Sequence, residues 1–99
     1  MINHVVLFKL KEFQQEEKQQ VISKLKAMLL GLKDKVEVLK HIEVNENYEL
    51  DAKSFDIALF SHVETLDDLE TYRVHPEHQK VLDYIKEVTV ARAAVDYNF

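Results

Sequence analysis

Residues 2–10 form an alternating segment in which both sets of side chains are largely apolar. One set contains Val5, Leu7 and Lys9, and the other contains His4, Val6, Phe8 and Leu10. Successive side chains of a β-strand point to opposite faces of the sheet, so a strand that is apolar on both faces needs cover on both. The segment therefore predicts a central strand, and it requires a fold that covers both sides of the sheet.

The next segments predict one helix followed by two strands. Apolar side chains recur on one helical face within residues 14–32, at positions 21, 25, 28, 29 and 32. Glutamate and glutamine lie early in this helix and Lys33 lies late, which the helix dipole favours. Apolar and β-branched residues then alternate with polar ones over about 36–44 and again over 55–63, and a polar segment at 45–54 joins these two strands.

The second half of the chain predicts two further helices and a last strand. Thr65 begins a capping-box pattern that opens a short helix to about residue 73. Pro76 suits the first position of a second helix that runs to about residue 87, and His75 before it is the expected N-cap. Residues 89–98 are rich in valine and alanine, which predicts a fourth strand.

The order strand, helix, strand, strand, helix, strand is that of a ferredoxin-like βαββαβ fold. This is an α+β class in which one four-stranded antiparallel sheet carries its helices on one face. The 99 residues, of which 46% are hydrophobic, suffice for a single domain over 1–99. The apolar side chains on the other face of the sheet still need cover, and a second copy of the chain is the simplest source. The sequence therefore predicts a homodimer.

Composition and charge narrow the possible partners and location. The net charge is −5 and the lysines are scattered singly, so no positive stripe is available for nucleic acid. No apolar stretch is long enough to span a membrane, and the first residues lack the pattern of a signal peptide. The absence of cysteine excludes disulfide and thiol chemistry. We therefore expect neither nucleic acid nor membrane as a partner, and a cytoplasmic location.

The helix junction at residues 70–78 brings together a phenol and two imidazoles: Tyr72, His75 and His78. His78 shares a helical face with Leu82 and Ile85, so we expect His78 and Tyr72 to point towards the sheet. A neutral imidazole accepts a proton near pH 7, and a tyrosine donates a hydrogen bond to a developing oxyanion. In the alternative interpretation, His78 is a half-buried core residue bonded to Tyr72. His75 and His78 lack an obvious third ligand, so we predict no metal and no cofactor.

Other polar residues in apolar surroundings are further candidates. His4 lies on a largely apolar strand face, which places it either at the edge of the core or in the same gap as His78. Arg92 lies in an otherwise apolar strand, where it either pairs with a carboxylate or binds an anionic ligand. His41 and His62 lie on strand faces that we expect to be solvated or to lie at the dimer surface.

Several motifs resemble those of a known family. They are His4-Val-Val-Leu-Phe-Lys-Leu, Phe55-Asp-Ile-Ala-Leu, Val63-Glu-Thr-Leu, Leu69-x-x-Tyr72-x-x-His75-Pro-x-His78 and Arg92-x-x-Val95-Asp-Tyr97. Across nearly all 99 residues the chain resembles the stress-responsive A/B barrel (Dabb) domain family, within the dimeric α+β barrel superfamily. The resemblance implies a homodimer in which two four-stranded sheets close into a barrel.

The resemblance also implies a pocket between the helices and the sheet. In plant polyketide cyclases of this family, a tyrosine and a histidine that match Tyr72 and His78 serve an aldol condensation. We therefore expect a pocket for a small hydrophobic or carbonyl-containing ligand, with these residues as its ligand-binding wall: His4, Val6, Phe8, Ile57, Leu59 and Arg92.

Three functional hypotheses follow from this pocket. The first is a stress-associated ligand-binding protein of unknown biochemical activity. The second is a cofactor-independent cyclase or lyase, in which His78 is the general base and Tyr72 the hydrogen-bond donor. The third is a haem- or oxygen-using monooxygenase of the wider superfamily, for which the sequence offers no axial ligand.

Overall fold

The computed structural model describes residues 1–48 and 53–99. Its elements are β1 (Ile2–Leu10), α1 (Gln15–Gly31), the 3-10 helix η1 (Leu32–Asp34), β2 (His41–Glu46), β3 (Ile57–Val63), α2 (Leu66–Val74), α3 (Pro76–Val88) and β4 (Thr89–Asn98). The order confirms the ferredoxin-like arrangement. The predicted polar connection 45–54 lies partly outside the described residues, and β2 extends into its beginning. No described helix is both long and apolar enough to cross a lipid bilayer.

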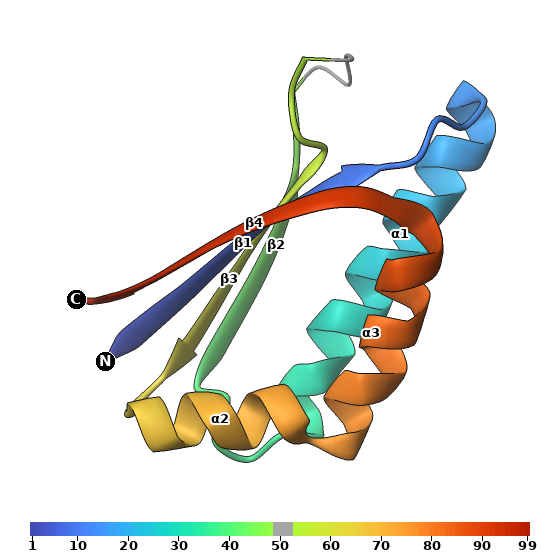
Figure 1. Cartoon of the computed structure of the whole chain (residues 1–99). Helices are drawn as coiled ribbons and strands as arrows, with labels where there is room; N and C mark the ends of the chain where they lie inside the picture. Colours follow the sequence, from blue (N-terminus) through green and yellow to red (C-terminus); the bar gives the residue numbers. More distant parts are fainter. Residues whose placement is uncertain (49–52) are drawn as a thin grey trace.

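The four strands form one antiparallel sheet in the order β2-β3-β1-β4. β1 pairs with β3 on one side and with β4 on the other, which confirms that it is central. Figure 1 shows α1 and α3 side by side over one face of the sheet, with α2 crossing near one end of the strands. The candidate site lies on this helix-covered face.

The core between the sheet and the helices follows the predicted periodicity. His4, Val6, Phe8 and Leu10 of β1 are all buried, as are alternate residues of β3 from Ile57 to Val63. Leu25, Leu29 and Leu32 meet them from the predicted face of the first helix. Burial of side chains of this size contributes roughly 1.5–3 kcal/mol each, so this face holds most of the apolar stabilisation.

The other face of the sheet carries no helix in the described part of the chain (Figure 1). Leu7 is 37% exposed there, and Val95 and Tyr97 are 55% and 45% exposed. His41 and His62 also lie on this face, with their ring centroids 4.7 Å apart. Within one chain, β1 is therefore covered fully on one side only.

The predicted start of the second strand at residue 36 is wrong. Residues 36–39 form a turn after η1, in which the amide of Val36 donates to the carbonyl of Leu32 and that of Leu39 to the carbonyl of Val36. Val36 and Leu39 are each 1% exposed. Their apolar character comes from filling the core below α1, and the pairing of β2 with β3 begins only at His41.

Candidate functional site

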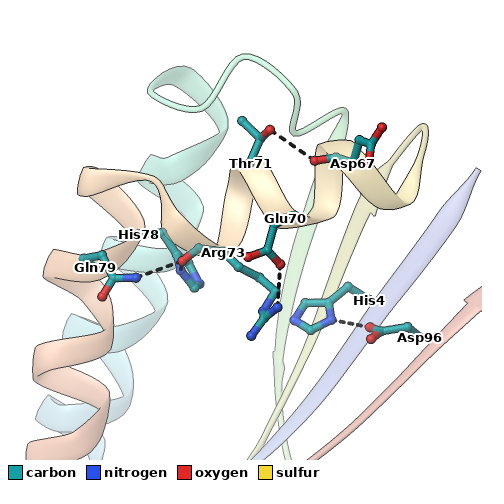
Figure 2. Close-up of polar contacts among 8 residues, drawn as sticks. All are labelled: His4, Asp67, Glu70, Thr71, Arg73, His78, Gln79 and Asp96. Carbon is teal, nitrogen blue, oxygen red and sulfur yellow. Dashed lines mark hydrogen bonds and ion pairs between the residues drawn. The ribbon is translucent and has the colours of Figure 1, made fainter.

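The junction between α2 and α3 sets the direction of His78. His75 leaves the helical region (φ −61°, ψ 135°), and its Nδ1 accepts a hydrogen bond of 3.1 Å from the amide of Glu77, as expected of an N-cap. The carbonyl oxygen of Arg73, near the end of α2, accepts hydrogen bonds from His78 Nδ1 and Gln79 Nε2, both at 2.9 Å (Figure 2). A carbonyl at a helix end needs such partners, and here it holds the imidazole in place.

This hydrogen bond also determines the tautomer of His78. A carbonyl can only accept, so Nδ1 carries the proton and Nε2 of the neutral ring presents its lone pair. No hydrogen bond to Nε2 is formed within residues 1–48 and 53–99. Burial lowers the pKa of His78; its bond to the Arg73 carbonyl opposes this, while the positive charges of His4, Arg73 and Arg92 reinforce it. His78 is therefore a neutral base at pH 7.

Tyr72 lies on the core side of His78 and is fully buried, with 0% of its surface exposed. Its ring centroid is 4.6 Å from that of His78, and its hydroxyl oxygen is 3.4 Å from Oγ of buried Ser61. Burial raises the pKa of Tyr72, while the contact with Ser61 acts in the opposite direction. The phenol therefore keeps its proton and supports the imidazole from the side of the core.

His4 forms a pair with Asp96 across two neighbouring strands. The two residues face each other in the β1–β4 register, and His4 Nδ1 bonds to the Asp96 carboxylate (Figure 2). The rings of His4 and Tyr72 are nearly perpendicular, with centroids 6.3 Å apart and planes at 84°. Asp96 was not among the site residues predicted from the sequence. The sequence did contain a signal for Asp96, because it lies four residues after Arg92 and therefore on the same face of the strand.

Arg92 lies opposite Phe8 in the β1–β4 register, on the helix-covered face. Within the described residues it forms no ion pair, unlike Arg73, whose Nη1 is 2.6 Å from the Glu70 carboxylate. Arg92 was expected either to pair with a carboxylate or to bind an anionic ligand, and the structure shows no carboxylate partner for it among these residues. The exposed guanidinium instead borders a cavity.

A cavity of about 350 Å³ lies between α3 and the β1–β4 side of the sheet. Most of the expected ligand-binding residues line it, together with His78: His4, Val6, Phe8, Leu59 and Arg92. A neighbouring cavity of about 380 Å³ shares His4, Arg73 and Arg92 and adds Glu70 and Asp96. The structure thus places Nε2 of His78 and the Arg92 guanidinium at the first cavity, and the His4–Asp96 pair and Arg92 at the neighbouring one.

Two of the predicted site residues do not line this cavity. Tyr72 is shielded from it, so only His78 of the pair reaches the hollow in the single chain. Ile57 is buried opposite Phe8 and borders a different hollow, with Leu7 and Phe55. Ile57 shares its strand face with Leu59, but at its level in the sheet the cavity lies over β1 and β4, where Phe8 and Arg92 line it.

The histidine and acidic side chains at the two cavities do not form a metal-binding cluster. Within residues 1–48 and 53–99 there is no cluster of three or more histidine, aspartate or glutamate side chains that could do so. The chemistry available from the described residues is therefore that of imidazole, carboxylate, guanidinium and phenol.

The fold and the site together define a ferredoxin-like α+β protein with a histidine-lined hollow between its helices and its sheet. The chain belongs to the stress-responsive A/B barrel (Dabb) domain family, whose model matches residues 2–99. No protein with a curated description matches it.

Solved structures agree with this assignment. A dimeric protein of unknown function from Bacteroides fragilis is 37% identical, with a TM-score of 0.89 over 99% of this chain and 95% of that chain. A dimeric ferredoxin-like protein of unknown function from Thermobifida fusca is 25% identical, with a TM-score of 0.80 over 99% and 90%. A hydroxynitrile lyase from Passiflora edulis shares the fold at 16% identity, with a TM-score of 0.76 over 97% and 90%. The first two are described as dimeric, which supports the predicted homodimer and, with it, the dimeric barrel.

Proposed function

We propose that this protein is a homodimeric A/B barrel protein that binds a small, largely apolar, carbonyl-containing ligand between its helices and its sheet. The observation that carries the proposal is the cavity of about 350 Å³, in which the bare Nε2 of neutral His78 stands among aliphatic and aromatic side chains. Ligand sites are commonly apolar hollows with a few placed polar groups, and this one fits that description.

The homodimer follows from the helix-free face of the sheet. Leu7, Val95 and Tyr97 lie on that face in register across β1 and β4, and each is more than a third exposed. A second copy that packs on this face supplies the missing cover, and the solved relatives described as dimeric support this arrangement. A stable monomer at micromolar concentration in analytical ultracentrifugation would refute it.

A second candidate function is a cofactor-independent cyclase or lyase in the same cavity. The protonation states favour it, because His78 is a neutral base and Tyr72 stays protonated. In this proposal Nε2 of His78 removes a proton from the carbon beside a carbonyl. The Tyr72 hydroxyl, which is shielded from the cavity in the single chain, would have to become accessible when the ligand binds in order to donate a hydrogen bond to the developing oxyanion. The lyase from Passiflora edulis, which shares the fold, is consistent with such chemistry on this scaffold.

The test is to identify the small molecules that stay bound through purification. Wild type, His78→Ala and His75→Asn are purified in parallel and analysed by mass spectrometry. His75→Asn is the matched control, because it removes a neighbouring imidazole and keeps an N-cap side chain. We expect a molecule that is retained by wild type and the control and lost from His78→Ala. Identical retention by all three proteins would show that His78 is not a site residue.

A further inference from the structure

The charge around the cavity differs in sign from that of the whole protein. The chain has a net charge of −5, yet among residues 1–48 and 53–99 those that line the cavity of about 350 Å³ include Arg73, Lys86 and Arg92 and no aspartate or glutamate. A concave site with walls of low dielectric strengthens the field of its lining charges. Because the charged side chains among the described lining residues are all basic, this cavity favours an anion although the whole protein is acidic.

Arg92 is the cation best placed to bind this anion. Arg73 is already engaged, since its guanidinium is 2.6 Å from the Glu70 carboxylate. Arg92 has no ion pair among the residues that the structure describes, and it borders both cavities. A guanidinium binds a carboxylate through two parallel hydrogen bonds, whereas Lys86 adds only a point charge at the same hollow.

The rest of the wall determines the shape and orientation of the ligand. Most of the cavity lining is apolar, with side chains that include Val6, Phe8, Leu29, Leu59, Leu82 and Ile85. The carboxylates of Glu70 and Asp96 border the neighbouring cavity, where they repel an anion. The charged end of a ligand is therefore favoured beside Arg92 and Lys86, while its apolar body packs against β1 and α3 near His78.

We propose that the ligand is an anionic amphiphile, an apolar molecule that carries a carboxylate, and that Arg92 is the residue that selects it. This inference rests on the proposed function, because it specifies the ligand class of the same cavity. If His78 also acts as a base, the substrate is a carbonyl compound with a carboxylate at the Arg92 end.

Binding of octanoate and octanamide tests this inference, because the two probes share an apolar chain and differ in charge. Isothermal titration calorimetry at low salt is run with wild type, Arg92→Gln, Arg92→Lys and Lys26→Gln. Lys26 is an exposed lysine of α1 that lines neither cavity, so its variant controls for the change in net charge. We expect octanoate to bind wild type and the control roughly tenfold more tightly than octanamide. Arg92→Gln should lose this preference, and Arg92→Lys should keep part of it.

A second readout separates recognition from a structural effect. Burial is the main cause of the lowered pKa of His78, and neighbouring positive charges, including that of Arg92, lower it further. Both probes bury His78 alike but only octanoate offsets the charge of Arg92, so the pKa should be higher with octanoate than with octanamide in wild type and equal with the two in Arg92→Gln. Equal binding of the two probes by wild type would overturn the inference and leave the ligand-binding proposal standing. Failure of octanoate to bind wild type at millimolar concentration would also overturn it.

Discussion

Substitution of Tyr72 separates its packing from its hydroxyl group. The hydroxyl oxygen is 3.4 Å from Ser61 Oγ, which is longer than the usual range of about 2.5–3.0 Å for such bonds. Its removal in Tyr72→Phe should therefore cost only about 0.5–1 kcal/mol of unfolding free energy. The aromatic ring, by contrast, is fully buried against His78, and Tyr72→Leu should cost roughly 2–4 kcal/mol.

The assay is urea denaturation of the three proteins at one chain concentration, because the stability of a dimer depends on concentration. Histidine NMR titration provides the second measurement. Tyr72→Phe should leave the pKa of His78 as it is in wild type. Tyr72→Leu should raise it towards the ordinary value, because part of the burial that lowers it is lost.

Two outcomes would refute this reasoning. A loss of more than about 2 kcal/mol in Tyr72→Phe would mean that the hydroxyl makes a strong buried hydrogen bond, contrary to the observed distance. An unchanged pKa of His78 in Tyr72→Leu would mean that the tyrosine ring does not shield the imidazole.

A Tyr72→Phe protein that keeps its stability but loses a reaction of wild type would identify the phenol as a donor to the substrate.

Three further predictions concern pH, assembly and a helix cap. The pKa of His78 is lowered in the folded state, so the contribution of His78 to the unfolding free energy should be complete above about pH 6.5 and should fall below that pH. Urea denaturation at a series of pH values below about 6.5 should therefore show a weaker pH dependence of stability in His78→Gln than in wild type. Leu7→Asp should shift the dimer towards monomer in sedimentation velocity, while Lys33→Asp, at an exposed position of η1, should not; a Leu7→Asp dimer would exclude the helix-free face as the interface. Thr65 Oγ1 accepts from the amide of Asp68 at 3.1 Å, so Thr65→Ala should cost about 1 kcal/mol in thermal or urea unfolding, and an equal loss in Thr65→Ser would contradict the capping role.

Most of the fold was predictable from the sequence because its signals are local. The alternation in residues 2–10 depends only on successive side chains of one strand, and it predicted both the central position of β1 and its buried set. The helix starts at Thr65 and Pro76 depend on hydrogen bonds two or three residues away. The wrong strand prediction at residues 36–39 arose because the burial of these residues depends on distant parts of the chain. Apolar residues that fill the end of a core cannot be told from a strand by their order in the sequence alone.

The candidate site was predictable in part. The spacing of Tyr72 and His78 along two helices correctly indicated that both face inwards, and their rings do meet. The spacing did not show that Tyr72 lies deeper in the core than His78. The depth of Tyr72 depends on how closely α2 packs on β3, where Ser61 lies against the phenol.

The sequence by itself determined that this chain forms one sheet with an apolar second face, and that a phenol and an imidazole approach each other at a helix junction. Only the tertiary structure paired His4 with Asp96, which is 92 positions away, and left Arg92 beside the cavity without a carboxylate among the described residues. The physical reason is the sequence distance over which each interaction acts. Periodicity and capping act within one element, whereas the partners of a charge depend on strand register and on helices that the chain brings together from distant positions.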